Sequence, residues 1–390
     1  MTPPSPLRTS HSERILVRGV NWLGDAVMTT PALLRLRQAR PGAHIALLTP
    51  EKLAGLWTHH PAIDVVLTFA QNDSLWRVAR KLRQGQFQIG LALPNSHRSA
   101  LELWLAGIPQ RVGCATRLRS WLLTRCVPPR TGILRMRKRS LVEIRRLIAA
   151  GAVEASNSAP CPSLSGAAHH LHHYLHLAAA LGANPEALPP FLDVPPGEVE
   201  AARQKFLLDD RAPWFALNPG AEYGPAKRWP RERFVAAAAE IQKRAGGRWV
   251  VCGGRGDVEL AADITAELTR DPARHPRQAP VNLAARTSLR ELCALLKGCR
   301  LLLTNDTGPM HVAAAVGTPV VAIFGSTSPE LTGPGLPAVS TNLLLQSNAA
   351  CSPCFRRRCP IDFRCMTGIS VARVVEAVLN ALNSSHEKNL

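Results

Sequence analysis

The 390-residue sequence is short of aromatic residues, of acidic residues and of long hydrophobic runs. Phe, Trp and Tyr together make up 5% of it, and no stretch reaches the roughly 18 consecutive apolar residues of a membrane-spanning helix. Residues 1–13 are polar and Pro-rich and lack an apolar core, so we do not expect a secretory signal peptide there. Ten cysteines are too dilute for a small disulfide-stabilised scaffold. These absences favour a globular, cytoplasmic protein.

The shortage of acidic residues leaves the chain strongly basic. It has 47 Lys and Arg against 28 Asp and Glu, a formal net charge of +19. Such a charge indicates a polyanionic partner: nucleic acid, an anionic membrane surface or a phosphorylated substrate. Residues 111–146 contain eleven of the cations and one acidic residue, Glu143, and we interpret this run as an anion-receiving surface. No RNA-binding aromatic pattern, zinc-finger spacing or helix-turn-helix signal accompanies it.

Short β-rich runs alternate with helical runs in two parts of the chain. In the first part, strands expected at 14–20, 44–50, 64–69 and 88–94 alternate with helices expected at 26–40 and 74–84. In the second part, strands are expected at 214–220, 248–254, 281–284, 300–306 and 319–325, and helices at 232–246, 289–299, 310–317 and 369–383. Alternation at this spacing predicts parallel sheets with helices on both faces.

The sequence therefore predicts an α/β protein with two doubly wound, Rossmann-like domains. The N-terminal domain is expected at 14–183 and the C-terminal domain at 201–368, with the Pro-rich segment 184–200 as the linker. Residues 1–13 are expected to be a disordered tail, and residues 369–390 a final helix and tail. Ligands of such sheets bind at the carboxyl ends of the strands, where the strand order reverses, so the loops directly after strands, around a cleft, are the expected site.

The loop after the first strand, Asn21 to Asp25, leads into a helix. Gly24 permits a tight turn or the close approach of another backbone. Asp25 lies at or near the start of the helix, where a carboxylate can simply cap the first turn. Alternatively, it is a general base at a strand end, with the apolar neighbours Trp22 and Leu23 raising its basicity.

Two loops in the second half combine features that suit phosphate. Residues 218–230 follow a buried strand and contain two glycines and Lys227, so they can present backbone N–H groups and a cation together. Residues 304–315 end a strand in Asn-Asp-Thr-Gly before a small-residue helix, whose first N–H groups form an anion site within reach of His311. The alternatives are a solvated loop, and a helix capped by Asp306 or Thr307 with an inert histidine.

Three further clusters are less specific. The GGRGD turn at 253–257 lacks the third glycine of a dinucleotide fingerprint. The cysteines Cys351, Cys354, Cys359 and Cys365 contain one CxxC but no second, so free or redox-linked thiols are favoured over a structural metal. A run of five histidines at 169–176 has no acidic or Cys neighbours, which favours an ordinary surface helix over a metal site.

Five segments in one order resemble the ADP-heptose:lipopolysaccharide heptosyltransferases, glycosyltransferase family 9. They are ILVRGVNWLGDAVMTTPAL (15–33), LPNSHRSAL (93–101), AGIPQRVG (106–113), PGAEYGPAKRWP (219–230) and LTNDTGPMHVAAA (303–315). The likeness covers nearly the whole chain after residue 13, and PGAEYGPAKRWP is most typical of the members that add the second heptose. It implies the GT-B arrangement, in which two Rossmann-like domains face a central cleft.

The resemblance also implies a reaction and a set of site residues. The expected reaction is the inverting transfer of L-glycero-D-manno-heptose from ADP-heptose to the anionic lipid A-Kdo-heptose acceptor, with no cofactor and no tightly bound metal. Asp25 would be the base that deprotonates the acceptor, and Lys227 would stabilise the departing ADP. Further donor contacts are expected from Asp306, Thr307, Gly308 and His311, and acceptor contacts from Asn95, Arg98, Arg117 and Arg119. Where the family often has an acidic residue for the ribose, this chain has Arg255.

The family's acceptor explains the positive charge without nucleic acid. An anionic glycolipid at a membrane face makes substrate and membrane one partner, so we expect a peripheral protein at the inner face of the inner membrane and no nucleic-acid partner. The nearest alternative is a family member that adds the first or third heptose. More distant alternatives are a nucleic-acid-binding protein, suggested by the charge, and a nucleotide-binding oxidoreductase, suggested by the βα units and the GGRGD turn.

Overall fold

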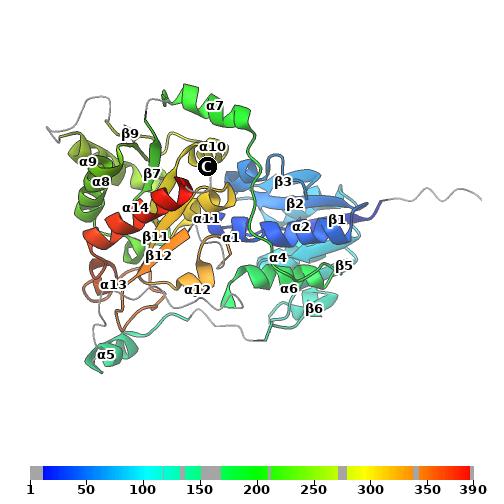
Figure 1. Ribbon diagram of the computed structural model, residues 1–390. Helices are drawn as coiled ribbons and strands as arrows, with labels where there is room; N and C mark the ends of the chain where they lie inside the picture. Colours follow the sequence, from blue (N-terminus) through cyan, green and yellow to red (C-terminus); the bar gives the residue numbers. More distant parts are fainter. Residues whose placement is uncertain are drawn as a thin grey trace, which may run out of the picture. The chain divides into compact units, whose positions relative to one another are not determined.

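The chain folds into two compact α/β units (Figure 1). Their structure is a computed structural model, which describes residues 12–116, 118–131, 137–150, 168–209, 212–270, 279–336 and 342–386. Unit 1 comprises Met1–Asn21, Ala32–Arg130 and His173–Glu186, and unit 2 comprises Trp22–Pro31, Thr131–His172 and Ala187–Leu390.

Unit 1 contains a six-stranded sheet with the strand order β3-β2-β1-β4-β5-β6. Every neighbouring pair of strands is parallel. The strands are β1 (Arg14–Arg18), β2 (His44–Pro50), β3 (Val65–Phe69), β4 (Ile89–Ala92), β5 (Gln110–Cys114) and β6 (Arg125–Val127). The α-helices are α2 (Thr30–Ala39), α3 (Leu75–Arg83), α4 (His97–Leu105) and α6 (Leu171–Ala179), with 3₁₀ turns η1 (Glu51–Trp57) and η2 (Ser120–Leu122).

Unit 2 repeats this topology in the order β12-β11-β10-β7-β8-β9, again wholly parallel. Its strands are β7 (Trp214–Asn218), β8 (Arg248–Val251), β9 (Val281–Asn282), β10 (Leu301–Asn305), β11 (Val320–Phe324) and β12 (Asn342–Gln346). The α-helices are α1 (Leu23–Met28), α5 (Leu141–Ala149), α7 (Pro196–Lys205), α8 (Arg231–Ala245), α9 (Val258–Thr269), α10 (Leu289–Gly298), α11 (Gly308–Ala315), α12 (Pro329–Thr332), α13 (Arg364–Thr367) and α14 (Val371–His386), with 3₁₀ turns η4 (Pro225–Lys227) and η5 (Arg255–Asp257).

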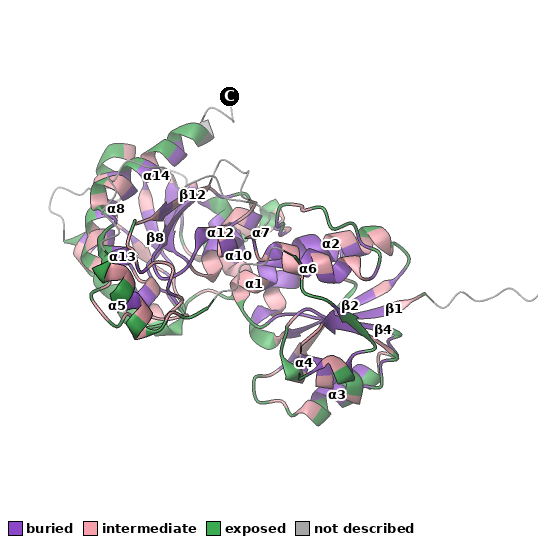
Figure 2. Ribbon diagram, turned by 90° about the horizontal axis from the view of Figure 1, so that it is seen from below, coloured by how far each residue is buried: buried purple, intermediate pink, exposed green. Residues whose placement is uncertain are grey.

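The central strands are buried on both faces, which is why they read as continuous hydrophobic runs. All five residues of β7, β10 and β11 are buried, and a core cluster of buried residues packs α8, α9 and α14 against them. Figure 2 shows buried strands under helices whose outer faces are exposed. Among the described residues, none of the helices combines the length and the apolar character that crossing a membrane requires.

The two predicted doubly wound sheets are confirmed, while several elements differ from the sequence expectation. The segment 26–40, expected to be one helix, belongs to two helices. Helix α1 ends at Met28, the chain turns at Thr29, and α2 begins at Thr30, just before Pro31. The segment 184–200, expected to be a linker, contains the start of α7. Strands β5, β6 and β12 were not predicted from the sequence. All three are edge or near-edge strands with partly exposed residues; β5 and β6 have no hydrophobic run, and β12 has only three consecutive leucines, at 343–345.

The two units are discontinuous in sequence, unlike the continuous domains expected from it. Helix α1, which follows β1 directly, packs in unit 2 against α11. Residues 131–172 also belong to unit 2. There, Ile144 of α5 is buried against Cys351 and Cys354 in a small apolar cluster. The basic run 111–146 is therefore divided between the units.

Candidate active site

The strand order of unit 2 places two long loops side by side. β7 and β10 are neighbours in the sheet although β8 and β9 lie between them in sequence. Their carboxyl ends lead into residues 219–230 and into Asp306. This is the point where the strand order reverses, which is where parallel sheets bind ligands. The structure thus brings the two predicted phosphate loops together.

Asn305 ties the loop 219–230 to the sheet. Its Nδ2 donates a hydrogen bond to the carbonyl oxygen of Pro219 at 2.7 Å, and its Oδ1 accepts one from the backbone N–H of Trp229 at 3.0 Å. The indole of Trp229 is buried and donates to the carbonyl oxygen of Ile369 at 3.1 Å. A buried amide with both ends paired fixes the loop at low cost, so Trp229 is a packing residue that anchors the loop.

Lys227 and Asp306 form an ion pair at the centre of this region. Lys227 Nζ lies 2.6 Å from Asp306 Oδ2, and the side chains are 12% and 4% exposed. The hydroxyl of Thr327 donates to the same carboxylate oxygen. The ring of Tyr223 lies 4.9 Å from Lys227 Nζ. The ammonium is therefore held in one position beside a π face, as an anion-binding cation needs to be.

The amino terminus of α11 faces this ion pair without a side-chain cap. Thr307 occupies the N-cap position in an extended conformation and makes no capping hydrogen bond. Asp306 does not cap the helix either, because its carboxylate contacts Lys227 and Thr327. Pro309 has no N–H, and the Met310 N–H donates to the carbonyl oxygen of Thr307. The first donor of α11 with the capacity to bind an anion is therefore the Gly308 N–H.

Two glycines allow α1 to pack directly on α11. A Cβ at Gly308 would lie 2.9 Å from the Cβ of Leu23, and a Cβ at Gly24 would lie 2.7 Å from Cδ2 of His311. Any larger residue at either position would push the helices apart. This contact places α1, and Asp25 with it, in unit 2, whereas the sequence analysis assigned Asp25 to the N-terminal domain.

Asp25 lies in the first turn of α1 and does not occupy the N-cap, which is Trp22. The carboxylate is partly buried, and burial raises its pKa above the ordinary value of 3.8. His170 and Lys227 lower this pKa and Asp306 raises it, so all three charges act on the same carboxyl group. A carboxylate with a raised pKa beside a fixed cation has the character of a general base.

Burial keeps two histidines near this site, His311 and His169, neutral at pH 7. Burial lowers the pKa of His311 to about 4, and that of His169 to about 4. His169 is fixed by the carbonyl oxygen of Gly333, 2.8 Å from its Nε2. Nδ1 of His311 is buried and has no protein hydrogen-bond partner. His311 thus supports α1 as a neutral ring.

In the GGRGD turn, Asp257 contacts the loop 219–230, whereas Arg255 is exposed. The Asp257 carboxylate accepts a hydrogen bond from Gly254 N–H at 3.1 Å and from Arg228 Nη2 at 3.1 Å. It also lies against Gly220, where a Cβ would be 2.3 Å from the carboxyl carbon. The acidic group of this turn is therefore two residues beyond the position that the sequence comparison suggested.

In unit 1, three of the predicted acceptor residues, Asn95, Arg98 and Arg119, lie in or contact the loop after β4 and the start of α4. Asn95 is exposed, with Nδ2 3.4 Å from His173 Nε2. The Arg98 guanidinium is 2.9 Å from Glu102 Oε1 and donates to the carbonyl oxygen of Asp73. Arg119 is 1% exposed and donates to the carbonyl oxygens of Pro94 and Ser96. Arg119 therefore supports the loop after β4 from beneath, and Arg117 lies outside the described residues.

Glu102 connects Arg98 to a buried ion pair. Arg18 Nε lies 2.8 Å from Glu102 Oε2, and both side chains are almost fully buried. Nη1 of Arg18 also donates to Asn21 Oδ1 at 3.0 Å. This network fixes the loop after β1 to α4, so much of the positive charge at this end of unit 1 has a structural use.

The C-terminal cysteines are free thiols in apolar surroundings. Cys351, Cys354 and Cys365 are buried and Cys359 is partly buried. Burial raises the pKa of Cys365 to about 12. Within the described ranges, no group of three or more His, Cys, Asp or Glu side chains is placed to hold a metal ion.

Sequence reasoning missed three residues of this site. Thr327 lies in no motif, and Tyr223, although part of PGAEYGPAKRWP, was given no role there; only the fold shows that they contact Asp306 and Lys227. His170 was part of the histidine run interpreted as a surface helix. That helix begins at Leu171, so His170 precedes it and interacts with Asp25.

Comparison with known proteins agrees with this geometry. The sequence matches glycosyltransferase family 9 (heptosyltransferase) over residues 162–363. It is 30% identical over 331 residues to lipopolysaccharide heptosyltransferase 2 of Escherichia coli K12, covering 82% of this chain and 85% of that protein. It is 25% identical to lipopolysaccharide heptosyltransferase 1 of Pseudomonas aeruginosa, covering 89% and 87%.

A solved structure matches both units. It is that of E. coli ADP-heptose LPS heptosyltransferase II, with a TM-score of 0.72, 26% identity, and coverage of 96% of this chain and 99% of that one. The two six-stranded parallel sheets described above correspond to the GT-B fold. The chain belongs to glycosyltransferase family 9, the heptosyltransferase family, and is a glycosyltransferase.

Proposed function

We propose that this protein transfers heptose from ADP-heptose to the heptose-Kdo inner core of lipopolysaccharide. The relatives named lipopolysaccharide heptosyltransferase 2 support the transfer of heptose to lipopolysaccharide. One observation carries the proposal. Asp25, whose pKa is raised by burial, lies in the same compact unit as the Lys227–Asp306 pair and the uncapped amino terminus of α11. A base and an anion site together are what an inverting transfer from a nucleotide sugar requires.

In the proposed reaction, Asp25 accepts the proton of the acceptor hydroxyl. The hydroxyl oxygen then attacks the anomeric carbon of the heptose from the face opposite the diphosphate, and the bond from that carbon to the diphosphate oxygen breaks. The electron pair leaves with ADP, and the configuration inverts. The Lys227 ammonium and the Gly308 N–H at the amino terminus of α11 stabilise the charge that develops on the diphosphate.

The other donor residues hold this arrangement. Asp306 keeps Lys227 in place through the 2.6 Å ion pair and offers its carboxylate to sugar hydroxyls. Thr307 and Gly308 supply the backbone of the α11 amino terminus. His311 packs against Gly24 and so fixes the position of α1, the helix that carries Asp25. We assign the ribose contact to Asp257, because Arg255 points to solvent and Asp257 faces the loop 219–230.

We assign the acceptor to unit 1, with Asn95, Arg98, Arg117 and Arg119 at or near its binding surface. Unit 1 also carries an exposed aromatic pair. Trp104 and Trp121 are 44% and 65% exposed, and their ring centroids are 6.1 Å apart. Exposed tryptophans on a basic unit suit the interface of an anionic membrane. The positive charge is therefore assigned to a glycolipid and its membrane, rather than to nucleic acid.

The deciding experiment measures ADP release by the purified protein from ADP-heptose. We expect release only when a heptose-Kdo acceptor is present, and a product in which the anomeric configuration of the transferred heptose is inverted. Release without acceptor, or no release with any lipopolysaccharide-core acceptor, contradicts the proposal. For the membrane, Trp121→Ala should reduce sedimentation with vesicles of 30% anionic lipid, while Trp76→Ala serves as an exposed-tryptophan control.

A second candidate is transfer of the first heptose. It is favoured by the 25% identity to lipopolysaccharide heptosyltransferase 1 over 89% of the chain. The same assay separates the two, since a first-heptose enzyme uses an acceptor that ends in Kdo, and a second-heptose enzyme needs a heptose already attached. The lower identity makes this the weaker candidate.

A further inference from the structure

Three consecutive arginines, at 356–358, have no role in the reaction described above. They lie in the segment 351–365 of unit 2, which also contains the four C-terminal cysteines. Arg356 donates a hydrogen bond to the carbonyl oxygen of Arg139 at 2.8 Å, whereas Arg357 and Arg358 are exposed. A run of exposed cations is usually a solvated surface, but the fold holds one of these arginines in a defined place.

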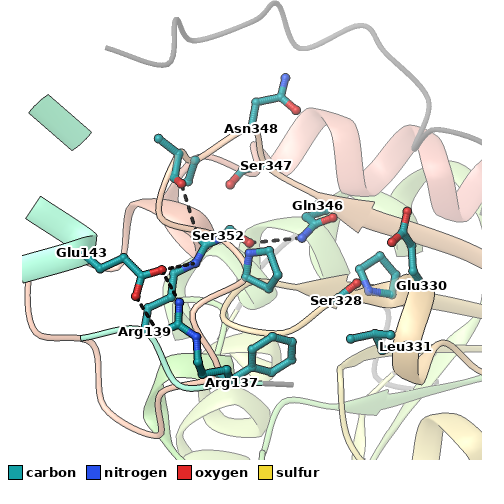
Figure 3. Close-up of a pocket in the computed structure, with 15 residues that line it drawn as sticks. Arg137, Arg139, Glu143, Ser328, Glu330, Leu331, Gln346, Ser347, Asn348 and Ser352 are labelled. Atoms are coloured by element: carbon teal, nitrogen blue, oxygen red, sulfur yellow. Dashed lines mark hydrogen bonds and ion pairs between the residues drawn. The ribbon is translucent and has the colours of Figure 1, made fainter. Parts of the chain in front are cut away.

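The backbone that precedes the arginines is anchored to unit 2. The N–H groups of Cys354 and Phe355 both donate to the carbonyl oxygen of Ser326, at 3.1 and 2.7 Å. The Ser352 hydroxyl accepts a hydrogen bond from Gln346 Nε2 at 3.1 Å, a contact drawn beside a cavity in Figure 3. Cys354 is buried and acts as a small apolar side chain. The arginines that follow therefore start from a fixed backbone.

The loop 219–230, which carries Lys227, packs on this anchored backbone. The N–H of Ala226 donates to the carbonyl oxygen of Arg357 at 3.1 Å. A Cβ at Gly224 would lie 2.5 Å from the same oxygen, so only glycine lets the loop approach this closely. The place of Arg357 beside the loop is therefore set by contacts between the two backbones.

The ring of Tyr223 lies near both the Arg357 guanidinium and the Lys227 ammonium. Its hydroxyl donates to the carbonyl oxygen of Phe355 at 2.8 Å, which fixes the ring. The ring centroid lies 5.2 Å from Cζ of Arg357 and 4.9 Å from Nζ of Lys227. Both distances are within the range at which a cation is attracted to an aromatic ring. A second cation is thus held beside the proposed donor site.

Arg357 differs from the cations of the loop 219–230 in its partners. Lys227 is paired with Asp306 at 2.6 Å, and Arg228 with Asp257 at 3.1 Å. A cation next to a carboxylate gives little net attraction for a ligand with several negative charges. Within the part of the chain that the structure describes, Arg357 forms no ion pair and its guanidinium donates no hydrogen bond. Its planar set of N–H donors matches the oxygens of a phosphate group.

We propose that Arg357 is a donor-binding residue, whose guanidinium binds the diphosphate of the nucleotide sugar alongside Lys227. This assignment rests on the proposed function, because it concerns the same donor site. Asp306 holds Lys227 in place and offsets much of its charge, and Arg357 supplies the charge that holds the nucleoside diphosphate. The buried cysteines of the segment 351–365 then serve to anchor a phosphate-binding arginine.

The test compares Arg357→Ala with Arg358→Ala, which removes the same charge at the next exposed position. Alanine at 357 keeps the contact with Ala226, since that contact uses the backbone carbonyl oxygen. Calorimetric titration of each full-length protein with ADP measures the affinity. We expect Arg357→Ala to weaken ADP binding about tenfold, because hydrogen bonds between charged groups are the strong ones. Arg358→Ala should change it less than about twofold. Arg357→Lys keeps the charge but loses the paired donors, so its affinity should fall between the two.

Urea unfolding of the same variants separates binding from structure, and all of them should unfold at the wild-type midpoint. An ADP affinity that is unchanged in Arg357→Ala, or reduced equally in Arg358→Ala, overturns the assignment. A loss of affinity that comes with a lowered midpoint overturns it as well. A wild type that binds ADP but transfers heptose to no lipopolysaccharide-core acceptor contradicts the proposed function, while the ADP titration still decides on Arg357. A wild type that does not bind ADP overturns both.

Discussion

The two units share one strand order but use their charged residues differently. Unit 1 has 17 Lys and Arg against 6 Asp and Glu, a formal charge of +11 on 134 residues, while unit 2 has 30 against 22, or +8 on 256 residues. Unit 1 buries two arginines, Arg18 and Arg119, to hold the loops after its strands. Unit 2 keeps Lys227 and two carboxylates, Asp25 and Asp306, around a candidate reaction centre.

This difference shows that a shared strand order sets where the loops lie in each unit, but does not set which charged residues those loops carry. In both units the loops at the point of strand reversal are fixed by a buried polar side chain, Arg18 in one and Asn305 in the other. A neutral amide leaves the charges of unit 2 available for ligands. In unit 1, by contrast, the charges of Arg18, Arg98 and Glu102 pair with one another to hold β1 and α4 together. The following predictions test this contrast, from the largest expected effect to the smallest.

The largest effect is expected at the proposed base of unit 2. Asp25→Asn should lower kcat by about 10²–10⁴-fold, because the acceptor hydroxyl loses its proton acceptor. Donor affinity, measured by calorimetry with ADP, should change little, since α1 keeps its packing on α11. Asp362→Asn, at an exposed carboxylate, is the control. Near-normal turnover of the Asp25 variant would refute the assignment.

In unit 1, the replacement of a buried carboxylate, that of Glu102, should affect the stability of the fold rather than catalysis. Glu102→Gln leaves the buried Arg18 without its counter-charge, and breaking a buried pair costs about 3–5 kcal/mol of unfolding free energy. Urea denaturation measures this. Glu376→Gln breaks an exposed pair with Arg244 and should cost less than about 1 kcal/mol. Equal effects of the two variants would mean that the buried network does not hold unit 1 together.

A steric change tests how closely α1 depends on α11. In Gly308→Ala, the new Cβ would lie 2.9 Å from that of Leu23, so α1 must shift. Overpacking of this kind costs about 1–3 kcal/mol, and kcat should fall as Asp25 moves with its helix. Gly256→Ala, where a Cβ meets nothing within 4 Å, is the matched control. The relevant measurements are the midpoint of urea unfolding and kcat, and a wild-type kcat at reduced stability would separate packing from catalysis.

The smallest effect is expected in the pH dependence. Asp25 acts ionised, and its pKa is raised mainly by burial, so kcat/KM should fall on the acid side at a pH above that of an ordinary aspartate. His170 lowers the pKa of Asp25. Removing it in His170→Ala should therefore move the acid limb to higher pH, while His44→Ala in unit 1 leaves it in place. A shift to lower pH would show that His170 acts on Asp25 in another way.

The parts of the fold that sequence could predict are those with local signals. The strands β7 and β10 are buried on both faces and appear as hydrophobic runs, so the loops after them, with Lys227 and Asp306, were predicted at the correct strand ends. Strands β5 and β6 carry exposed or half-exposed arginines and give no such run. The pairing of Asp306 with Thr327 joins two different loops, and no local pattern predicts it.

Two residues, Asp25 and Arg119, lie in surroundings that differ from those expected from the sequence. Asp25 follows β1 of unit 1 in the chain, yet Gly24 and Gly308 let its helix pack in unit 2. Arg119 belongs to a basic run that predicts an exposed anion-binding surface, yet it is buried against the carbonyl oxygens of the loop after β4. Both outcomes depend on contacts between segments distant in sequence.

The placement of α1 has a consequence for protein engineering. The chain leaves unit 1 after Asn21 and returns to it at Ala32, so residues 22–31 form a short insert whose packing partners are in unit 2. A chimera could take residues 32–130 from another family member and keep the native insert. Such an exchange would give the enzyme a different version of the proposed acceptor-binding unit, while the proposed base Asp25 and the proposed leaving-group cation Lys227 are inherited together with unit 2.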